Sequence, residues 1–86
     1  MAKAFYYPIN EEPFTSDEKP TLKEAQEFVG GYVEKFPKRF LPKGFKGELL
    51  MNEDGRLKNM PLNEVVSKQV GFEVVGPAIV LQGCKF

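Results

Sequence analysis

The chain has no histidine and only one cysteine among its 86 residues. Histidine is the commonest general base and the commonest zinc ligand, so its absence argues against an acid–base enzyme and against a zinc site. The single cysteine, Cys84, excludes an internal disulfide. Its only basic neighbour in the sequence is Lys85, which favours an ordinary thiol over a reactive one.

Long apolar segments are also missing. No apolar run approaches the roughly 18 residues that a membrane span needs, and segment 1–13 lacks the apolar core of a signal peptide. The sequence therefore predicts a soluble, cytoplasmic protein without membrane contact. No residue pattern predicts a metal site or a cofactor. The chain is also not expected to be an enzyme. Without histidine, acid–base catalysis would need Glu, Lys, Tyr or Cys, and a small domain has little room to remove these side chains from water.

Charge is balanced in total but not along the chain. Twelve basic side chains offset 12 acidic ones, so the net charge predicts no general attraction to nucleic acid or membranes. Acids outnumber bases before Lys35, whereas the segment from Lys35 to Lys46 contains five bases and no acid. This segment therefore stands out electrostatically from the rest of the chain.

The first half of the chain predicts a strand, an acidic loop and a helix. The aromatic run 3–7 is typical of a strand, and Pro8 after it favours a place at the sheet edge. Segment 9–20 is rich in acids and turn formers and predicts a solvated loop. Thr21 and Glu24 form a capping-box pattern for a helix over 22–29, which the pair Gly30-Gly31 ends.

The second half predicts four strands and a shorter helix. Segments 32–36 and 47–51 have strand character and flank a loop at 38–46. The turn 52–55 predicts a hairpin in which Gly55 has a positive φ and 56–59 is the return strand. A helix is expected from Pro61 to about Lys68, and the apolar run 78–81 predicts an interior strand.

These elements predict one α+β domain over 1–86, in which a small, mainly antiparallel sheet carries one main helix on one face, with a second short helix. Hydrophobic residues make up 42% of the chain and include eight phenylalanines, enough for one core. The residues expected in this core are Leu22, Ala25, Phe28, Val29, Val33, Leu49, Met51, Leu57, Leu62, Val66, Ile79 and Leu81.

Three polar or glycine features have a structural interpretation that outweighs a functional one. The glycine pair at 30–31 follows a helix C-terminus, whose dipole is unfavourable for a phosphate. The oxygen-rich turn 52–54 lacks the ligand spacing of a calcium loop and fits turn chemistry. Asn63 is a candidate for binding through its amide, but it and Asn59 are equally good candidates to cap the short helix.

The basic segment is the candidate site. It places Lys38, Arg39, Phe40, Lys43 and Phe45 close together in sequence. Cations beside aromatic rings suit an acidic protein surface, where the rings serve as anchors, and they also suit single-stranded nucleic acid, where bases stack on the rings. The alternative is a solvated loop whose rings cover the core. Of the two kinds of partner, the protein surface is favoured.

Three segments together resemble a known family. They are VGGYVE at 29–34, MNEDGRLKNMPLN at 51–63 and VGPAIVL at 75–81. In this order they are similar to a small domain of unknown function, found mainly in bacteriophages and in phage-derived bacterial genes. The resemblance covers about 21–83, while 1–20 adds a strand and an acidic loop. The loop 37–46 is longer than in the family, and the acidic segment 9–20 is peculiar to this chain.

The resemblance implies a phage-encoded origin but no reaction, because the family has no assigned activity. The expected function is therefore that of a small accessory protein that binds and modulates a host macromolecule in the host cytoplasm, with a protein favoured as the partner. Two alternatives stay open at this point. One is a module that binds or sequesters a small ligand or nucleotide, with pockets between subunits. The other is single-stranded nucleic-acid binding through the basic segment.

Overall fold

The apolar run near the C-terminus forms β5 (Ala78–Gln82), the middle strand of a five-stranded sheet in the computed structural model, which describes residues 2–86. β5 pairs with β1 (Lys3–Tyr7) on one side and with β4 (Glu48–Asn52) on the other. Its first four residues are buried. Burial on both faces of the sheet explains why this strand is apolar throughout rather than alternating.

The sheet order is β2-β1-β5-β4-β3, and every pair of neighbours is antiparallel. The edge strands are β2 (Phe14–Ser16) and β3 (Val33–Lys35). The prediction that 3–7 is an edge strand is therefore wrong, as is the prediction that all of 9–20 is loop. Phe14 lies opposite Tyr6 and stacks on it with ring centroids 4.7 Å apart, and this aromatic contact stabilises the pairing of β2 with β1.

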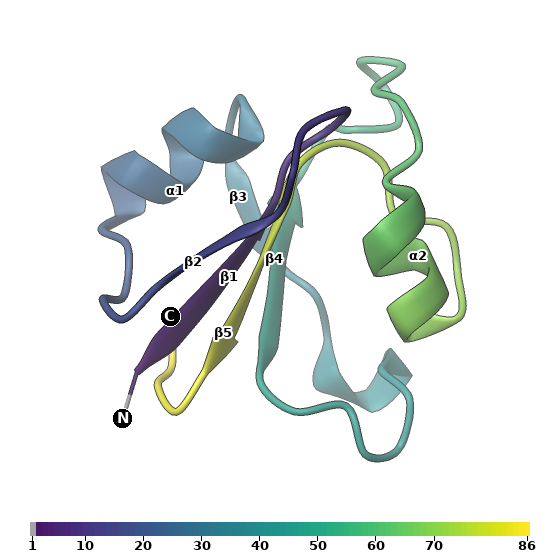
Figure 1. Cartoon of the computed structure of the whole chain (residues 1–86). Coiled ribbons are helices and arrows are strands. Elements are labelled where there is room, and N and C mark those ends of the chain that lie inside the picture. Colours follow the sequence, from purple (N-terminus) through teal and green to yellow (C-terminus); the bar gives the residue numbers. More distant parts are fainter. Residues whose placement is uncertain (1) are drawn as a thin grey trace.

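A helix covers each face of the sheet (Figure 1). α1 (Leu22–Val29) buries Ala25 and Val29 in one core cluster, which contains Leu50 and Ile79 from the sheet. α2 (Glu64–Val70) buries Val66 and Val70 in a second cluster on the opposite face. The α+β class and the antiparallel sheet are confirmed. The expected single main helix is not, because the two helices have eight and seven residues and each covers a face.

The helix ends show which sequence signals decide their positions. Thr21 and Glu24 form both hydrogen bonds of the capping box, at 3.1 and 2.9 Å, and Gly30 ends α1 with a φ of +83°, as predicted. α2 begins later than Pro61, because Asn63 is its N-cap and accepts from the amide of Val66. Asn59, the other candidate cap, instead has a φ of +54° in the preceding turn.

The expected hairpin after β4 is wrong. Residues 53–59 form consecutive turns, and the antiparallel partners of β4 are β3 and β5. Gly55 is not among the residues with positive φ. Its glycine identity has a steric reason, because a Cβ there would lie 2.9 Å from Cγ2 of Val75. Close packing against the segment before β5 therefore replaces the expected turn geometry.

Most of the expected core is buried or half-buried, with three exceptions. Leu22, Leu57 and Leu62 are 58%, 84% and 42% exposed. Leu22 is the first residue of α1, Leu57 lies in the turns after β4, and Leu62 precedes α2, where it forms an isolated bridge with Val75. Each lies outside the part of its segment that packs on the sheet, which apolar spacing alone does not reveal.

Candidate functional site

The basic segment folds into a short, regular turn between β3 and β4. Pro37, with φ fixed near −59°, precedes the 3-10 helix η1 (Lys38–Phe40). The amide of Phe40 donates to the carbonyl of Pro37 at 3.1 Å, and that of Leu41 donates to the carbonyl of Lys38 at 3.0 Å. The turn exposes Lys38, Arg39 and Phe40 to solvent.

An aromatic row supports the exposed end of η1. Phe36 stacks on Phe72 with ring centroids 4.7 Å apart and meets Phe40 at 6.3 Å in an edge-to-face contact. The guanidinium of Arg39 lies 4.7 Å from the centroid of Phe40, which is a cation–π distance. Phe40 remains 59% exposed. The row thus presents one cation and one ring together, backed by two rings that lead toward the core.

The remaining two candidate residues lie in different environments. Lys43 is exposed in the turn that follows η1. Phe45 is half-buried and packs against the core cluster beneath α2, so it contributes more to the core than to the surface. The exposed part of the candidate site is therefore made of Lys38, Arg39, Phe40 and Lys43, which we call the basic patch.

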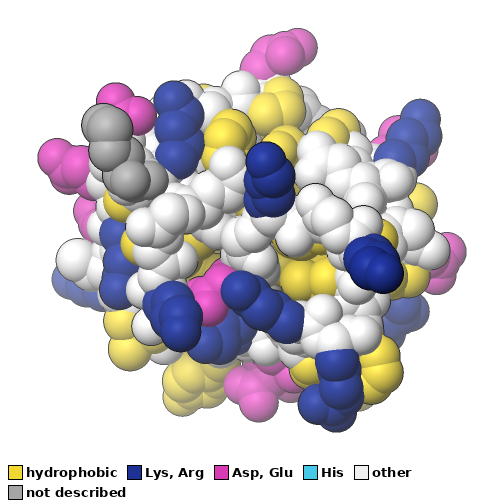
Figure 2. Space-filling view, turned by 90° about the horizontal axis from the view of Figure 1, so that it is seen from below, with side chains coloured by type: hydrophobic (Ala, Val, Ile, Leu, Met, Phe, Trp, Pro, Cys, Tyr) yellow, Lys and Arg dark blue, Asp and Glu magenta, His cyan; other side chains and the backbone are white. Residues whose placement is uncertain are grey.

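The charges of the basic patch are not neutralised within the part of the chain that the structure describes. There, the two ion pairs join Lys3 to Asp17 at 3.4 Å and Lys35 to Glu48 at 3.6 Å, and neither involves the patch. Figure 2 looks at the end of the molecule that carries the loop after η1. Basic side chains spread over this end, and acidic side chains lie mostly around its rim. A neutral chain thus carries a locally positive end.

Segments 29–34 and 51–63 of the sequence meet at one structural junction. The buried amide of Asn52 donates to the carbonyl of Val29 at 2.9 Å, and its oxygen accepts from the amide of Asp54 at 2.7 Å. Nζ of Lys58 lies 3.3 Å from the carbonyl of Gly30, at the negative end of the α1 dipole. These contacts give the glycine pair and the acidic turn structural roles. Among residues 2–86 no group of three or more potential ligands is placed to hold a metal ion.

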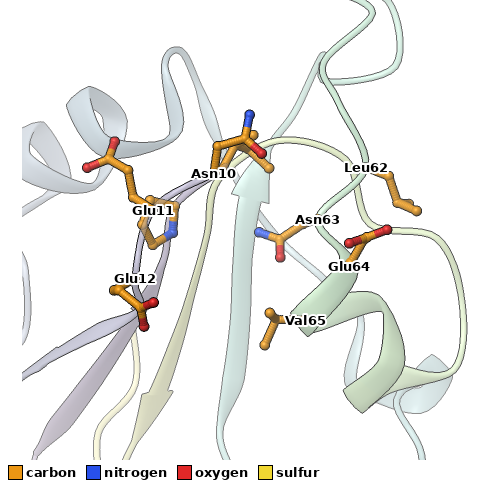
Figure 3. Close-up of a pocket in the computed structure, with 9 residues that line it drawn as sticks. Asn10, Glu11, Glu12, Leu62, Asn63, Glu64 and Val65 are labelled. Atoms are coloured by element: carbon orange, nitrogen blue, oxygen red, sulfur yellow. The ribbon is translucent and has the colours of Figure 1, made fainter.

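A groove of about 460 Å³ lies between the β1–β2 turn and the start of α2. Figure 3 shows that the side chains of Glu11, Glu12 and Glu64 point in different directions around it. The amide of Asn63 is already bonded to the carbonyl of Gly76 at 3.0 Å. No polar groups converge in this groove, which therefore lacks the arrangement of a small-ligand site.

Cys84 is a free, half-buried thiol that packs against the core cluster beneath α1.

Within the described residues, no helix has both the length and the apolar character to cross a membrane. Comparison of the chain with protein-family models, with curated proteins and with solved structures gave no match.

Sequence reasoning missed two contributors to the candidate site. One is Phe72, which supports Phe36 from 36 positions further along the chain. A stack over this separation has no signal in a single sequence. The other is the position of β3 at the sheet edge, where no strand from residues 2–86 pairs with its outer side. An edge position depends on the order of the strands in the sheet, which no local sequence pattern reveals.

Proposed function

We propose that the protein is a non-catalytic binding protein that attaches to an acidic surface of another protein through the basic patch. The observation that carries this proposal is the pairing of Arg39 with the exposed ring of Phe40, outside any ion pair among residues 2–86. Arginine and aromatic residues are enriched at the energetic centres of protein interfaces. Unneutralised cations beside them attract an acidic partner.

The geometry favours a protein over single-stranded nucleic acid. Sequence-tolerant binding of a nucleic-acid strand uses several exposed rings on which successive bases stack. Here Phe40 is exposed, but Phe36 is partly covered by its contacts with Phe40 and Phe72, and Phe45 packs inward. One ring next to a guanidinium suits a single anchoring contact better than a row of bases. The resemblance to a phage-associated domain supports a bacterial protein as the partner and a phage-encoded accessory role.

The first test compares two probes, poly-glutamate and oligothymidylate, by fluorescence anisotropy at several salt concentrations. We expect tighter binding of poly-glutamate, with an affinity that falls as salt rises, because exposed charges are screened beyond about 8 Å at physiological ionic strength. Tighter binding of oligothymidylate would instead support the nucleic-acid function. Binding of neither probe, together with no retained protein from a bacterial lysate, would contradict the proposal.

The second test uses two charge-matched variants. Lys38→Glu combined with Arg39→Glu reverses two charges of the basic patch. Lys23→Glu combined with Lys68→Glu makes the same change in net charge on α1 and α2. We expect the first variant to lose poly-glutamate binding by at least about tenfold and the control to retain it, because local rather than net charge sets the contact. In a nuclease-treated bacterial lysate, a stoichiometric partner should be lost by the first variant only.

A further inference from the structure

A second groove opens next to the aromatic row that supports the basic patch. It has a volume of about 280 Å³, and its walls include Phe36 and Phe72, the two stacked rings behind Phe40. Further apolar side chains line it, namely those of Met51, Leu57 and Val75. Because Phe36 contacts Phe40 and also lines this groove, the basic patch and the groove are adjacent on one chain.

The charges of this groove are opposite to those of the basic patch. It is lined by four acids and one base, a net charge of −3, and these residues are Glu34, Glu53, Asp54, Glu73 and Arg56. We call it the acidic groove. The basic patch has three cations and no acid, a net charge of +3. Surfaces of opposite charge attract each other, so each of the two has the charge that the other requires in a partner.

Each surface also exposes an apolar side chain that the fold leaves uncovered. Phe40 in the basic patch is 59% exposed, and Leu57 in the acidic groove is 84% exposed. Protein interfaces combine an apolar centre with a polar or charged rim. A phenylalanine that entered the groove would meet Leu57, while the cations beside it met the surrounding acids. The patch and the groove therefore match in polarity as well as in charge.

The patch and the groove of one chain do not neutralise each other. Pro37 and the hydrogen bonds of η1 fix the patch beside the groove, and among residues 2–86 neither ion pair involves a cation of the patch or an acid of the groove. A second copy, related to the first by a two-fold axis near Phe36, brings its patch to the first copy's groove and receives the first copy's patch in its own. Such an arrangement makes both contacts at once and closes at two copies.

We propose that two copies of the chain associate through this pair of contacts, with Arg39 and Phe40 of each copy in the acidic groove of the other. The inference goes beyond the proposed function and does not require it, because the occupant of the groove is a second copy of this chain. It has one consequence for that function. The dimer covers the basic patch, so self-association and binding of an acidic partner exclude each other.

The contact should be weak and sensitive to salt. Each half is centred on one ring and a few exposed charges, and small interfaces are typically transient. In sedimentation equilibrium at low salt, we expect a mass that rises from one chain toward two as the concentration approaches about 1 mM. At about 0.5 M salt the mass should return toward one chain, because exposed charges are then strongly screened.

Two charge-reversal variants test which surfaces meet. Lys38→Glu with Arg39→Glu makes the patch negative, and Glu53→Lys with Glu73→Lys makes the groove positive. Glu53 and Glu73 are exposed and lie outside both ion pairs of residues 2–86, so the fold should tolerate their replacement. Each variant alone should dimerise at least about tenfold more weakly than the wild type, because its homodimer has two contacts between like charges.

An equimolar mixture of the two variants should restore the dimer. In the mixed pair, the negative patch of one variant meets the positive groove of the other, and their unchanged surfaces also match. A chain with all four substitutions should dimerise with itself for the same reason. The control, Glu11→Lys with Glu12→Lys, makes the same change in net charge as the groove variant, but in the β1–β2 turn, and should associate nearly as the wild type does.

The outcomes separate this inference from the proposed function. If the wild type remains a single chain at about 1 mM in low salt, or if mixing the variants restores nothing, the dimer is wrong, and binding of poly-glutamate decides the proposed function by itself. A mass that rises past two chains would overturn the two-fold arrangement. If the dimer and its rescue are observed but poly-glutamate does not bind even to the groove variant, the dimer stands and the proposed function is wrong. If both are correct, the groove variant should bind poly-glutamate at least as tightly as the wild type, because its patch stays uncovered.

Discussion

The side chain of Asn63 is bonded to the backbone of Tyr7, 56 residues earlier in the chain. Its amide nitrogen lies 2.9 Å from the carbonyl oxygen of Tyr7 and 3.0 Å from that of Gly76. Its oxygen accepts from the amide of Val66 at the start of α2. One buried side chain therefore joins the end of β1, the first turn of α2 and the segment before β5.

Asn63→Asp tests this junction. The carboxylate retains the helix cap, because it still accepts from the amide of Val66, but it loses both donated bonds and faces two carbonyl oxygens. Leaving buried polar groups unpaired costs about 1–3 kcal/mol each, so we expect unfolding to become easier by at least about 3 kcal/mol in urea denaturation. Asn59→Asp is the control, because Asn59 is exposed and aspartate also tolerates a positive φ. A loss of equal size in both variants would contradict the special role of Asn63.

A second prediction concerns two glycines of the same loop. Gly44 and Gly47 have similar φ angles, +94° and +103°, but different surroundings. A Cβ at Gly44 has no neighbour within 4 Å, whereas one at Gly47 would overlap the backbone carbonyl oxygen of Leu81. Gly44→Ala should cost about 1–3 kcal/mol for backbone strain alone.

Gly47→Ala adds the overlap with β5, which has no room to move in the centre of the sheet. We expect it to cost at least about 2 kcal/mol more than Gly44→Ala, measured by thermal and urea unfolding. Equal losses in the two variants would show that the loop moves away from Leu81 and that the close approach is unimportant.

The parts of the fold that were predictable depend on contacts close in sequence. The capping box at Thr21 and the stop at Gly30 were correct, because each is decided within a single turn of chain. The interior strand at 78–81 was correct, because its apolar run needs burial on both sides. By contrast, β2 is stabilised by a stack between Phe14 and Tyr6 across a hairpin, and a three-residue strand among acids gives too weak a local signal.

The hairpin predicted after β4 is wrong for the same reason, namely a contact with a residue that is distant in sequence. An Asn-Glu-Asp-Gly turn is typical of a hairpin, but Asn52 uses its side chain to bond the end of α1, which commits the turn to a distant partner. For the candidate site, the sequence singled out the basic segment, and its function stays a prediction. It did not separate Phe45 from Phe40, because charge density and aromatic content say nothing about which ring faces the core.

A third prediction uses the pH dependence of stability. Burial, followed by the nearby charge of Glu24, raises the pKa of Tyr6 above its ordinary value of 10.0. The neutral phenol is therefore favoured in the folded state. The contribution of the neutral Tyr6 phenol to the free energy of unfolding is complete below pH 10.0, the pKa of the unfolded chain. It is lost as the pH rises from there through the pKa of the folded state, because the unfolded chain releases the proton first.

Tyr6→Phe retains the ring that stacks on Phe14 but cannot ionise. Between neutral pH and values above 10.0, the free energy of unfolding should fall less in this variant than in the wild type. Glu24→Gln should lower the pKa of Tyr6, seen in the absorbance of the phenolate, while the amide oxygen still accepts from Thr21 in the capping box. Identical alkaline losses for the wild type and Tyr6→Phe would contradict the prediction.

The last prediction separates the structural from the functional rings of the basic segment. Phe45 is half-buried and packs against the cluster beneath α2, whereas Phe40 is 59% exposed. Phe45→Ala should therefore destabilise the fold by about 2–3 kcal/mol, since the full burial of a phenylalanine is worth about 3–5 kcal/mol and this ring is only partly covered. Phe40→Ala should cost less than about 1 kcal/mol, because truncating an exposed side chain removes little packing.

Binding of poly-glutamate should show the opposite order. Phe40→Ala removes the ring on which the guanidinium of Arg39 rests, so affinity should fall by at least about fivefold while the variant stays folded. Phe45→Ala, measured at a temperature where it remains folded, should bind nearly as the wild type does. If Phe45→Ala loses binding and Phe40→Ala retains it, Phe45 rather than Phe40 is the anchoring ring and the prediction is wrong. Loss in neither would mean that the cations bind without any aromatic contact.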